Sequence, residues 1–224
     1  MKFLGGITKT DWQRPSVIAL VLANLVPVLG VFYFHWEVFP LMFLFWSENV
    51  IIGVFNVLRM LVAMFYKDRV LPGIPFFCVH YGGFVAAHGF LILELFGGGA
   101  KQYEEFFNPL DPGTYWQIFG QINGEYHLDW AILALAVSRG FSFVTNYLGR
   151  GEYRRITPNQ LFWRPYGRIL ILHVALLVGG ISLKASHSPA IGLVVLIVLK
   201  TAGDLIGHFI ERRKFAENLA VKTG

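Results

Sequence analysis

Long apolar stretches, separated by short polar segments, run along almost the whole of this chain. A helix that crosses a bilayer needs about 20 mostly apolar residues, because about 30 Å of hydrocarbon is crossed at 1.5 Å per residue. The sequence therefore predicts an all-α integral membrane protein, a single domain over residues 1–224 built as a bundle of six transmembrane helices. The six predicted spans lie at about residues 16–34, 38–66, 75–96, 128–148, 166–184 and 189–211.

The amino-acid composition agrees with a protein of the bilayer rather than of water. Of the 224 residues, 55% are apolar and 15% are charged, whereas a soluble domain carries about 25% charged residues. The single cysteine, Cys78, excludes a disulfide within the chain. The net charge of +5 comes from basic residues that form no stripe interleaved with aromatic residues, so nucleic acid is not an expected partner. The expected partner is the lipid bilayer itself.

The distribution of basic residues among the connections predicts how the helices are oriented. Lys and Arg gather before the first span, after the second, around the connection between the fourth and fifth, and after the sixth. These segments carry fourteen basic residues, and the opposite side carries only Lys101 and Lys184. Because basic connections stay in the cytoplasm, both termini are predicted to be cytoplasmic. The one long connection, residues 97–127, then lies outside, and its aromatic stretch 112–122 is expected to lie on the membrane as a short amphipathic helix.

Several ionisable residues lie inside predicted spans, where they are costly and mark candidate functional sites. Distances counted from the cytoplasmic end of each helix, at about 1.5 Å per residue, group them by depth. The residues expected at about 6–12 Å are His80, His173, His208, Asp204 and Arg59. Those expected at about 15–18 Å are Arg139 and Lys200, and nearer the middle are Glu48 and His88. A polar pocket in the cytoplasmic half of the bundle is therefore predicted.

The residues of this pocket match the ligand types of a divalent metal site, zinc above all. A bound metal lowers the pKa of a water molecule to about 7 and supplies a hydroxide nucleophile. Glu48 is the expected general base, and Arg59 and Arg139 are expected to contact an anionic substrate or an oxyanion. The leading hypothesis is a metal-dependent hydrolase that acts on a lipid or another membrane-partitioned substrate from the cytoplasmic side. The proposed metal ligands are His80, His173 and His208, with Asp204 as the fourth ligand or as an orienting carboxylate.

The same residues allow functions of other classes. The main alternative is a transporter or channel for a small anion or a proton, with the buried charges and histidines lining a conduit. A third hypothesis is a sensor or haem-binding protein that uses a pair of histidines. In a purely architectural role, Glu48 would form ion pairs with Arg59, Arg139 or Lys200 that fix the register of the helices. The lack of internal repeats favours the enzyme, and the three buried cations favour transport.

A set of motifs adds to this interpretation. The motifs are Trp46-Ser47-Glu48-Asn49 with Asn56 and Arg59, His80-Tyr81-Gly82-Gly83-Phe84, Ser142-Phe143 with Asn146-Tyr147, His173, and Asp204 with His208. This combination resembles an uncharacterised prokaryotic family of multi-pass membrane proteins, known only as a domain of unknown function. The resemblance covers about residues 38–212. It implies a six-helix domain in the prokaryotic inner membrane and no established activity.

A looser similarity runs to the seven-helix membrane hydrolases that include alkaline ceramidases and adiponectin-type receptors. That resemblance implies a zinc ion held by three histidines beside a Ser and an Asp, an inventory that this chain echoes with His80, His173, His208, Asp204 and Ser142. The last helix departs from the pattern, because Asp204-x-x-x-His208 stands where those proteins carry His-x-x-x-His, and this chain has one span fewer. The similarity therefore concerns the chemistry of the site and not the family.

Overall fold

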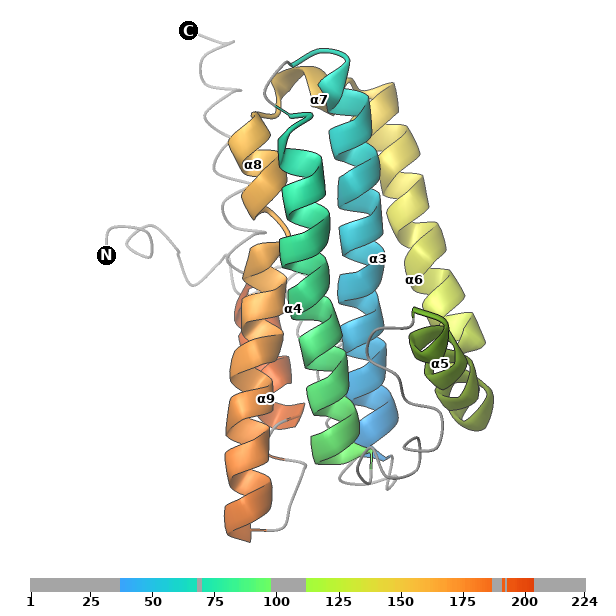
Figure 1. The fold of residues 1–224 in the computed structure, drawn as a ribbon, viewed down its shortest axis with the longest axis vertical. Coiled ribbons are helices and arrows are strands. Elements are labelled where there is room, and N and C mark those ends of the chain that lie inside the picture. The colour runs from blue at the N-terminus through green and yellow to red at the C-terminus, as the bar shows by residue number, and fades with distance from the viewer. Residues whose placement is uncertain (1–36, 68–69, 98–111, 187–190, 192, 204–224) are drawn as a thin grey trace, which may run out of the picture.

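The structure is a computed structural model, and it describes residues 37–67, 70–97, 112–186, 191 and 193–203. All regular structure within these residues is helical (Figure 1). Four helices of the described part are long and apolar enough to cross a membrane, namely Val38–Met64, Gly73–Phe96, Asp129–Gly149 and Pro158–Ser182. The predicted first span, residues 16–34, lies outside the described residues, and so do residues 204–211 of the predicted sixth.

The first two described spans form an antiparallel helix pair. They are α3 (Val38–Met64) and α4 (Gly73–Phe96), and they lie side by side along the bundle axis (Figure 1). They confirm the predicted helices 38–66 and 75–96 to within two residues at each end. A count of apolar residues is therefore enough to place both helices.

Two glycines allow α3 and α4 to approach each other closely. A Cβ atom at Gly53 of α3 would lie 2.6 Å from Cε1 of Tyr81 on α4. A Cβ atom at Gly89 of α4 would lie 3.0 Å from the ring of Trp46 on α3. An aromatic ring of each helix thus packs against a glycine of the other, and such use of small residues is common between membrane helices.

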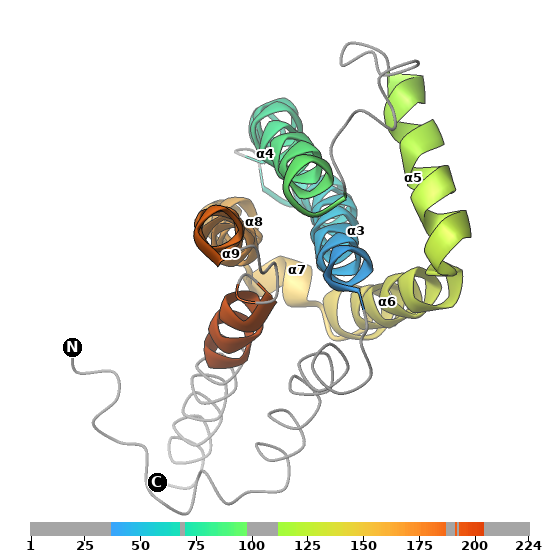
Figure 2. The same ribbon diagram turned by 90° about the horizontal axis from the view of Figure 1, so that it is seen from below.

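Helix α5 (Pro112–Tyr126) lies across the bundle and not along it, as the view from below shows (Figure 2). Its buried residues Ile118 and Ile122 belong to an apolar cluster that also contains residues of α3. The short helix predicted over residues 112–122 is confirmed and extends four residues further. Its placement on a membrane surface stays a prediction.

The third described span changes its helical type partway along. Helix α6 (Asp129–Ser142) continues directly into the π-helix η2 (Phe143–Gly149), and together they confirm the predicted fourth span. Gly151 follows with a left-handed φ of 66°, which glycine adopts without a steric penalty. The chain thereby turns into the short helix α7 (Glu152–Arg155).

The helix predicted over residues 166–184 starts where predicted, but the apolar span that contains it begins earlier. Helix α8 (Pro158–Trp163) precedes helix α9 (Tyr166–Ser186), and the two form the fourth apolar span of the described part. A capping box starts α8: Gln160 N donates to Thr157 Oγ1 at 3.2 Å, and Thr157 N donates to Gln160 Oε1 at 3.0 Å. The earlier start of the span places the side chains of α9 deeper in it than a start at residue 166 would.

The helices run alternately up and down the bundle (Figure 1). The connection between α3 and α4 lies at the same end of the bundle as α7, and the last residues of α4 and α9 lie at the opposite end. The two basic connections that the sequence assigns to the cytoplasm therefore share one end. The described part of the sixth span is helix Leu193–Gly203. Six spans and two cytoplasmic termini stay predictions, because residues 1–36 and 204–224 lie outside the described residues.

Two apolar clusters fill the described bundle. One joins the first half of α3 to the end of α4, α5, α9 and helix Leu193–Gly203, and Met42 and Ile92 are fully buried in it. The other joins the second half of α3 to the start of α4, η2 and α8, and it buries Met60 and Phe77. Three consecutive buried polar residues of α3 lie between these clusters: Ser47, Glu48 and Asn49.

Candidate functional site

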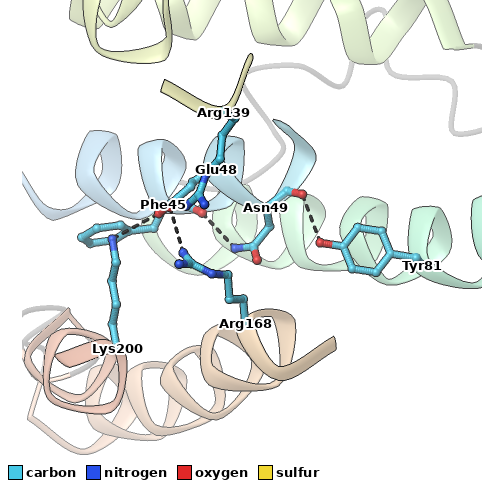
Figure 3. A network of polar contacts seen from close by, with 7 residues as sticks. All are labelled: Phe45, Glu48, Asn49, Tyr81, Arg139, Arg168 and Lys200. Atoms are coloured by element: carbon cyan, nitrogen blue, oxygen red, sulfur yellow. Dashed lines mark hydrogen bonds and ion pairs between the residues drawn. The ribbon is translucent and has the colours of Figure 1, made fainter. Parts of the chain in front are cut away.

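The carboxylate of Glu48 lies at the centre of a network of ion pairs (Figure 3). Its Oε1 atom lies 2.6 Å from Nη2 of Arg139 on α6 and 2.8 Å from Nη1 of Arg168 on α9. Its Oε2 atom lies 3.1 Å from Nζ of Lys200 on helix Leu193–Gly203. Among the described residues, one carboxylate thus joins three cations from three other helices.

The positions of these residues along their helices explain why they meet. Arg139 is the middle residue of the 21-residue span Asp129–Gly149. Arg168 lies ten residues after Pro158, where the next span begins. Glu48 lies ten residues after the start of α3, about 15 Å along its axis. All of them lie well inside apolar spans, where an unpaired charge is costly.

Hydrogen bonds of the neighbouring residue fix how α3 presents Glu48. Nδ2 of Asn49 donates to the carbonyl of Phe45 at 2.9 Å. The hydroxyl of Tyr81 on α4 donates to the carbonyl of Asn49 at 3.0 Å (Figure 3). Because Tyr81 also packs against Gly53, two contacts of one side chain set the rotation of α3 relative to α4 in the turns that follow Glu48.

The three cations are more accessible than the carboxylate that they surround. The side chains of Arg139, Arg168 and Lys200 are 32%, 35% and 24% exposed, against 9% for Glu48. Nζ of Lys200 also lies 4.6 Å from the ring centroid of Phe45, a cation–π contact. Two guanidinium groups and one ammonium group together carry more N–H donors than a single carboxylate accepts. The chemistry of this network therefore suits an anion.

Arg59 lies apart from this network, eleven residues further along α3, or about 16 Å. Its Cζ atom lies 5.6 Å from the ring centroid of Tyr147 on η2. Its carbonyl accepts a hydrogen bond from the hydroxyl of Tyr147 at 2.7 Å, and its Nε atom is buried without a partner among the described residues. Of the three cations that the sequence offers to Glu48, Arg139 and Lys200 are bound to it, and Arg59 is not.

His173 of α9 pairs with His88 of α4. Nε2 of His88 lies 3.0 Å from Nδ1 of His173, and Nδ1 of His88 lies 2.6 Å from the carbonyl of Phe84. A carbonyl only accepts, so in the neutral pair Nδ1 of His88 carries a proton and Nε2 of His88 accepts from Nδ1 of His173. This assignment gives Nε2 of His173 a lone pair.

His80 lies in different surroundings, eight residues and about 12 Å before His88 along α4. Its Nδ1 atom lies 2.8 Å from the hydroxyl of Tyr166, and its ring stacks on Phe76 with the ring centroids 5.1 Å apart. The sequence groups His80 with His173 by depth, and the structure does not. The reason is the early start of the fifth span, which carries His173 deeper, to the level of His88.

The predicted metal ligands can be placed only in part. Asp204 and His208 lie outside the described residues, and His80 and His173 bind the separate partners given above. Within the part of the chain that the structure describes, no group of three or more His, Cys, Asp or Glu side chains is arranged to hold a metal ion. The metal site stays a prediction.

Arg168 is the member of the network that sequence reasoning missed. By its position in the sequence it belongs with the basic residues that flank a connection, because the predicted span begins only two residues before it. The signal that reveals it is Thr157-Pro158-Asn159-Gln160, a capping box with Pro at the first helical position. A span that starts there contains a charged residue ten positions inside.

The comparisons with known proteins assign the chain to a family and give no function. The described part of the chain is helical throughout, and its several membrane-length apolar helices around a charged centre have the architecture of an integral membrane protein. The chain belongs to a family of unknown function (DUF6498), whose model matches residues 7–220. A search of the curated proteins and a search of the solved structures each found no match. Membership of an uncharacterised family is confirmed, whereas a prokaryotic origin and the similarity to zinc membrane hydrolases stay predictions.

Proposed function

We propose that this protein moves a small anion across a membrane and binds it at the three cations around Glu48. The observation that carries the proposal is the convergence of Arg139, Arg168 and Lys200 on one buried carboxylate. Three cations share this carboxylate, and their N–H donors outnumber the positions at which it accepts hydrogen bonds, which favours an anion at the same place. This function is the transport alternative that the sequence offers.

The energetic argument favours function over packing. A charged side chain costs about 2.5–3.5 kcal/mol at the centre of a membrane helix, and such residues usually line ion or substrate pathways. A single pair, Glu48 with Arg139, would fix the register of α3 and α6 at a lower cost. Cations from three helices around one point instead resemble the rings of Arg and Lys that select anions in pores.

Glu48 has the role of a resident counter-ion in this proposal. When no anion is bound, its carboxylate holds the three cations together at distances of 2.6–3.1 Å. The side chain of Glu48 is nearly buried, whereas about a quarter to a third of the surface of each cation side chain is exposed. An incoming anion therefore meets N–H donors before it meets Glu48.

Vesicles that contain the purified protein test the proposal with radiolabelled chloride and nitrate. Native protein should move at least one of the two anions faster than protein-free vesicles do. A hydrogen bond to a charged group is worth about 1.5–3 kcal/mol, so Arg168→Gln should weaken the apparent affinity for the anion by about tenfold to a hundredfold.

Arg164→Gln is the matched control for Arg168→Gln. Arg164 forms an exposed ion pair with Glu152 at 2.8 Å, and exposed pairs contribute at most about 1 kcal/mol. Its loss should leave anion movement unchanged. An Arg168→Gln variant that moves chloride and nitrate with native affinity would contradict the proposal, and so would native vesicles that are no faster than empty ones.

A metal-dependent hydrolase is the second candidate, and the pair of His88 and His173 supports it. A metal-binding histidine almost always donates its other ring N–H to an acceptor. His173 does so toward His88, and its Nε2 atom has the lone pair that a metal needs. Elemental analysis of protein purified without a His tag or chelator tests this candidate. About one divalent ion per chain, lost in His173→Ala, would support it, and a metal-free native preparation would reject it.

A further inference from the structure

We propose further that the transported anion is a small planar oxoanion that carries its own O–H group, with bicarbonate as the simplest example. This inference rests on the proposed function, because it concerns the same site. Its starting point is the buried side chain of Asn49, the residue that follows Glu48 on α3. Asn49 is 6% exposed, and its Oδ1 atom has no hydrogen-bond partner among the described residues. A buried acceptor without a donor is costly, which favours a ligand that donates a hydrogen bond to it.

One hydrogen bond fixes the orientation of the Asn49 amide. Its Nδ2 atom donates to the carbonyl of Phe45 at 2.9 Å. A carbonyl only accepts hydrogen bonds, so the nitrogen of the amide must face Phe45, and Oδ1 is the atom that remains available. Figure 3 shows the amide on the side of α3 from which Arg168 reaches Glu48. An unpaired acceptor therefore lies beside the cationic donors that favour an anion.

The carboxylate of Glu48 offers a second acceptor at the same place. A carboxylate has about four positions that accept hydrogen bonds. Among the described residues three of them are used, since Oε1 accepts from Arg139 and Arg168, and Oε2 accepts from Lys200. An anion without a proton meets only repulsion from this carboxylate, whereas an anion with an O–H group can donate a hydrogen bond to it. The site thus combines cationic donors for an anion with acceptors for a hydroxyl group.

The group that the three cations hold in the structure is planar. Their nitrogen atoms lie 2.6–3.1 Å from the two oxygens of the Glu48 carboxylate. Guanidinium groups match such a planar pair of oxygens in geometry, and a halide has no second atom to offer. Bicarbonate has the same planar pair and adds the O–H group that Asn49 and Glu48 can accept. Nitrate has the same shape and charge but no proton, so a comparison of these two ions isolates the O–H group.

Thermal unfolding of the detergent-purified protein compares the two ions. Each is titrated in sealed samples at a mildly alkaline pH, where dissolved carbonate is mostly bicarbonate, and a bulky sulfonate keeps the ionic strength constant. An anion that binds the folded protein raises the melting temperature, and the concentration dependence of this rise gives its apparent dissociation constant. The additional hydrogen bond should make the affinity for bicarbonate about threefold to tenfold higher than that for nitrate.

Two variants assign the preference to one amide. Asn49→Leu keeps the approximate size of the side chain and removes the acceptor, so most of the preference for bicarbonate should disappear. Asn123→Leu makes the same chemical change on α5, where Nδ2 of Asn123 donates to Oδ1 of Asp129, and should keep the native ratio of the two affinities. Loosened packing of α3 in Asn49→Leu would lower both affinities together and leave their ratio unchanged.

The outcomes separate this inference from the proposed function. A native protein that binds nitrate as tightly as bicarbonate would overturn the preference for an O–H group and leave anion transport standing. A preference that persists in Asn49→Leu would overturn the assignment to Asn49 and leave a water molecule as the partner of its Oδ1 atom. Native vesicles that move neither chloride nor nitrate would overturn the proposed function, whichever ions the detergent-purified protein binds.

Discussion

Replacing Glu48 by Gln removes the carboxylate on which three cations of the described residues converge, and it hardly changes the size of the side chain. The amide keeps the shape of the side chain but removes the negative charge that the three cations share, with their nitrogen atoms gathered around one point. Breaking a buried ion pair by removing one partner costs about 3–5 kcal/mol, because the other charge stays behind. We expect the lower end, about 3 kcal/mol, because the cation side chains are 24–35% exposed and their repulsion is partly screened.

Thermal unfolding of the detergent-purified protein measures this loss. In a chain of 224 residues, about 1 kcal/mol shifts the melting temperature by about 2–4 °C. Glu48→Gln should therefore lower it by about 6–12 °C. The double variant with Arg139→Gln removes one of the repelling cations and should recover part of the drop. Glu125→Gln, which changes an exposed carboxylate on α5, should stay within about 2 °C of the native protein.

The response of the Glu48→Gln variant to anions completes the test. At constant ionic strength, replacing a bulky organic anion by chloride should stabilise this variant more than the native protein, because chloride takes the place of the missing carboxylate. A variant as stable as the native protein would refute the reasoning about the three cations. A destabilised variant that gains no more from chloride than the native protein does would make the network purely architectural.

Three further predictions concern packing and topology. Gly53→Ala forces Tyr81 away from the backbone of α3, since the new Cβ would lie 2.6 Å from its ring, and thermal unfolding should show that the protein is less stable by about 1–3 kcal/mol. The control Gly82→Ala, where a new Cβ has nothing within 4 Å, should not destabilise the protein. Asn56→Ala removes a 2.9 Å hydrogen bond from α3 to the backbone of α8 and should lower the free energy of unfolding by about 1–3 kcal/mol. Chemical denaturation measures this loss, and an unchanged free energy of unfolding would contradict the prediction. Reporter fusions in the α3–α4 connection and in α7 should report the cytoplasm, and a fusion near residue 105 the outside; the opposite pattern would reverse the orientation.

The apolar spans are the part of this protein that the sequence predicts well. The ends of α3 and α4 match the predicted ranges to within two residues. Helix α5 also lies where its aromatic stretch indicates. These features depend on local composition and on a fixed rise per residue, and neither requires knowledge of a distant part of the chain.

The start of the fifth span shows what a count of apolar residues misses. The apolar composition favours a start near residue 166, where α9 does begin, but the capping box at Thr157 and Gln160 starts the short helix α8 at Pro158 and extends the span. That one boundary decides whether Arg168 lies in a connection or deep in the bundle. It also decides whether His173 lies at the level of His80 or at that of His88.

The sequence by itself determined that buried Glu, Arg, Lys and His residues lie inside apolar spans, since their type and approximate depth can be read along one helix. Only the tertiary structure decided which of them meet. Glu48 binds Arg139, Arg168 and Lys200 and not Arg59, which lies on the same helix and is closer in the sequence. The reason is that a partner across helices depends on the rotation and start of every helix involved. Those are set by distant contacts, such as Tyr81 against Gly53, that no pattern within one span contains.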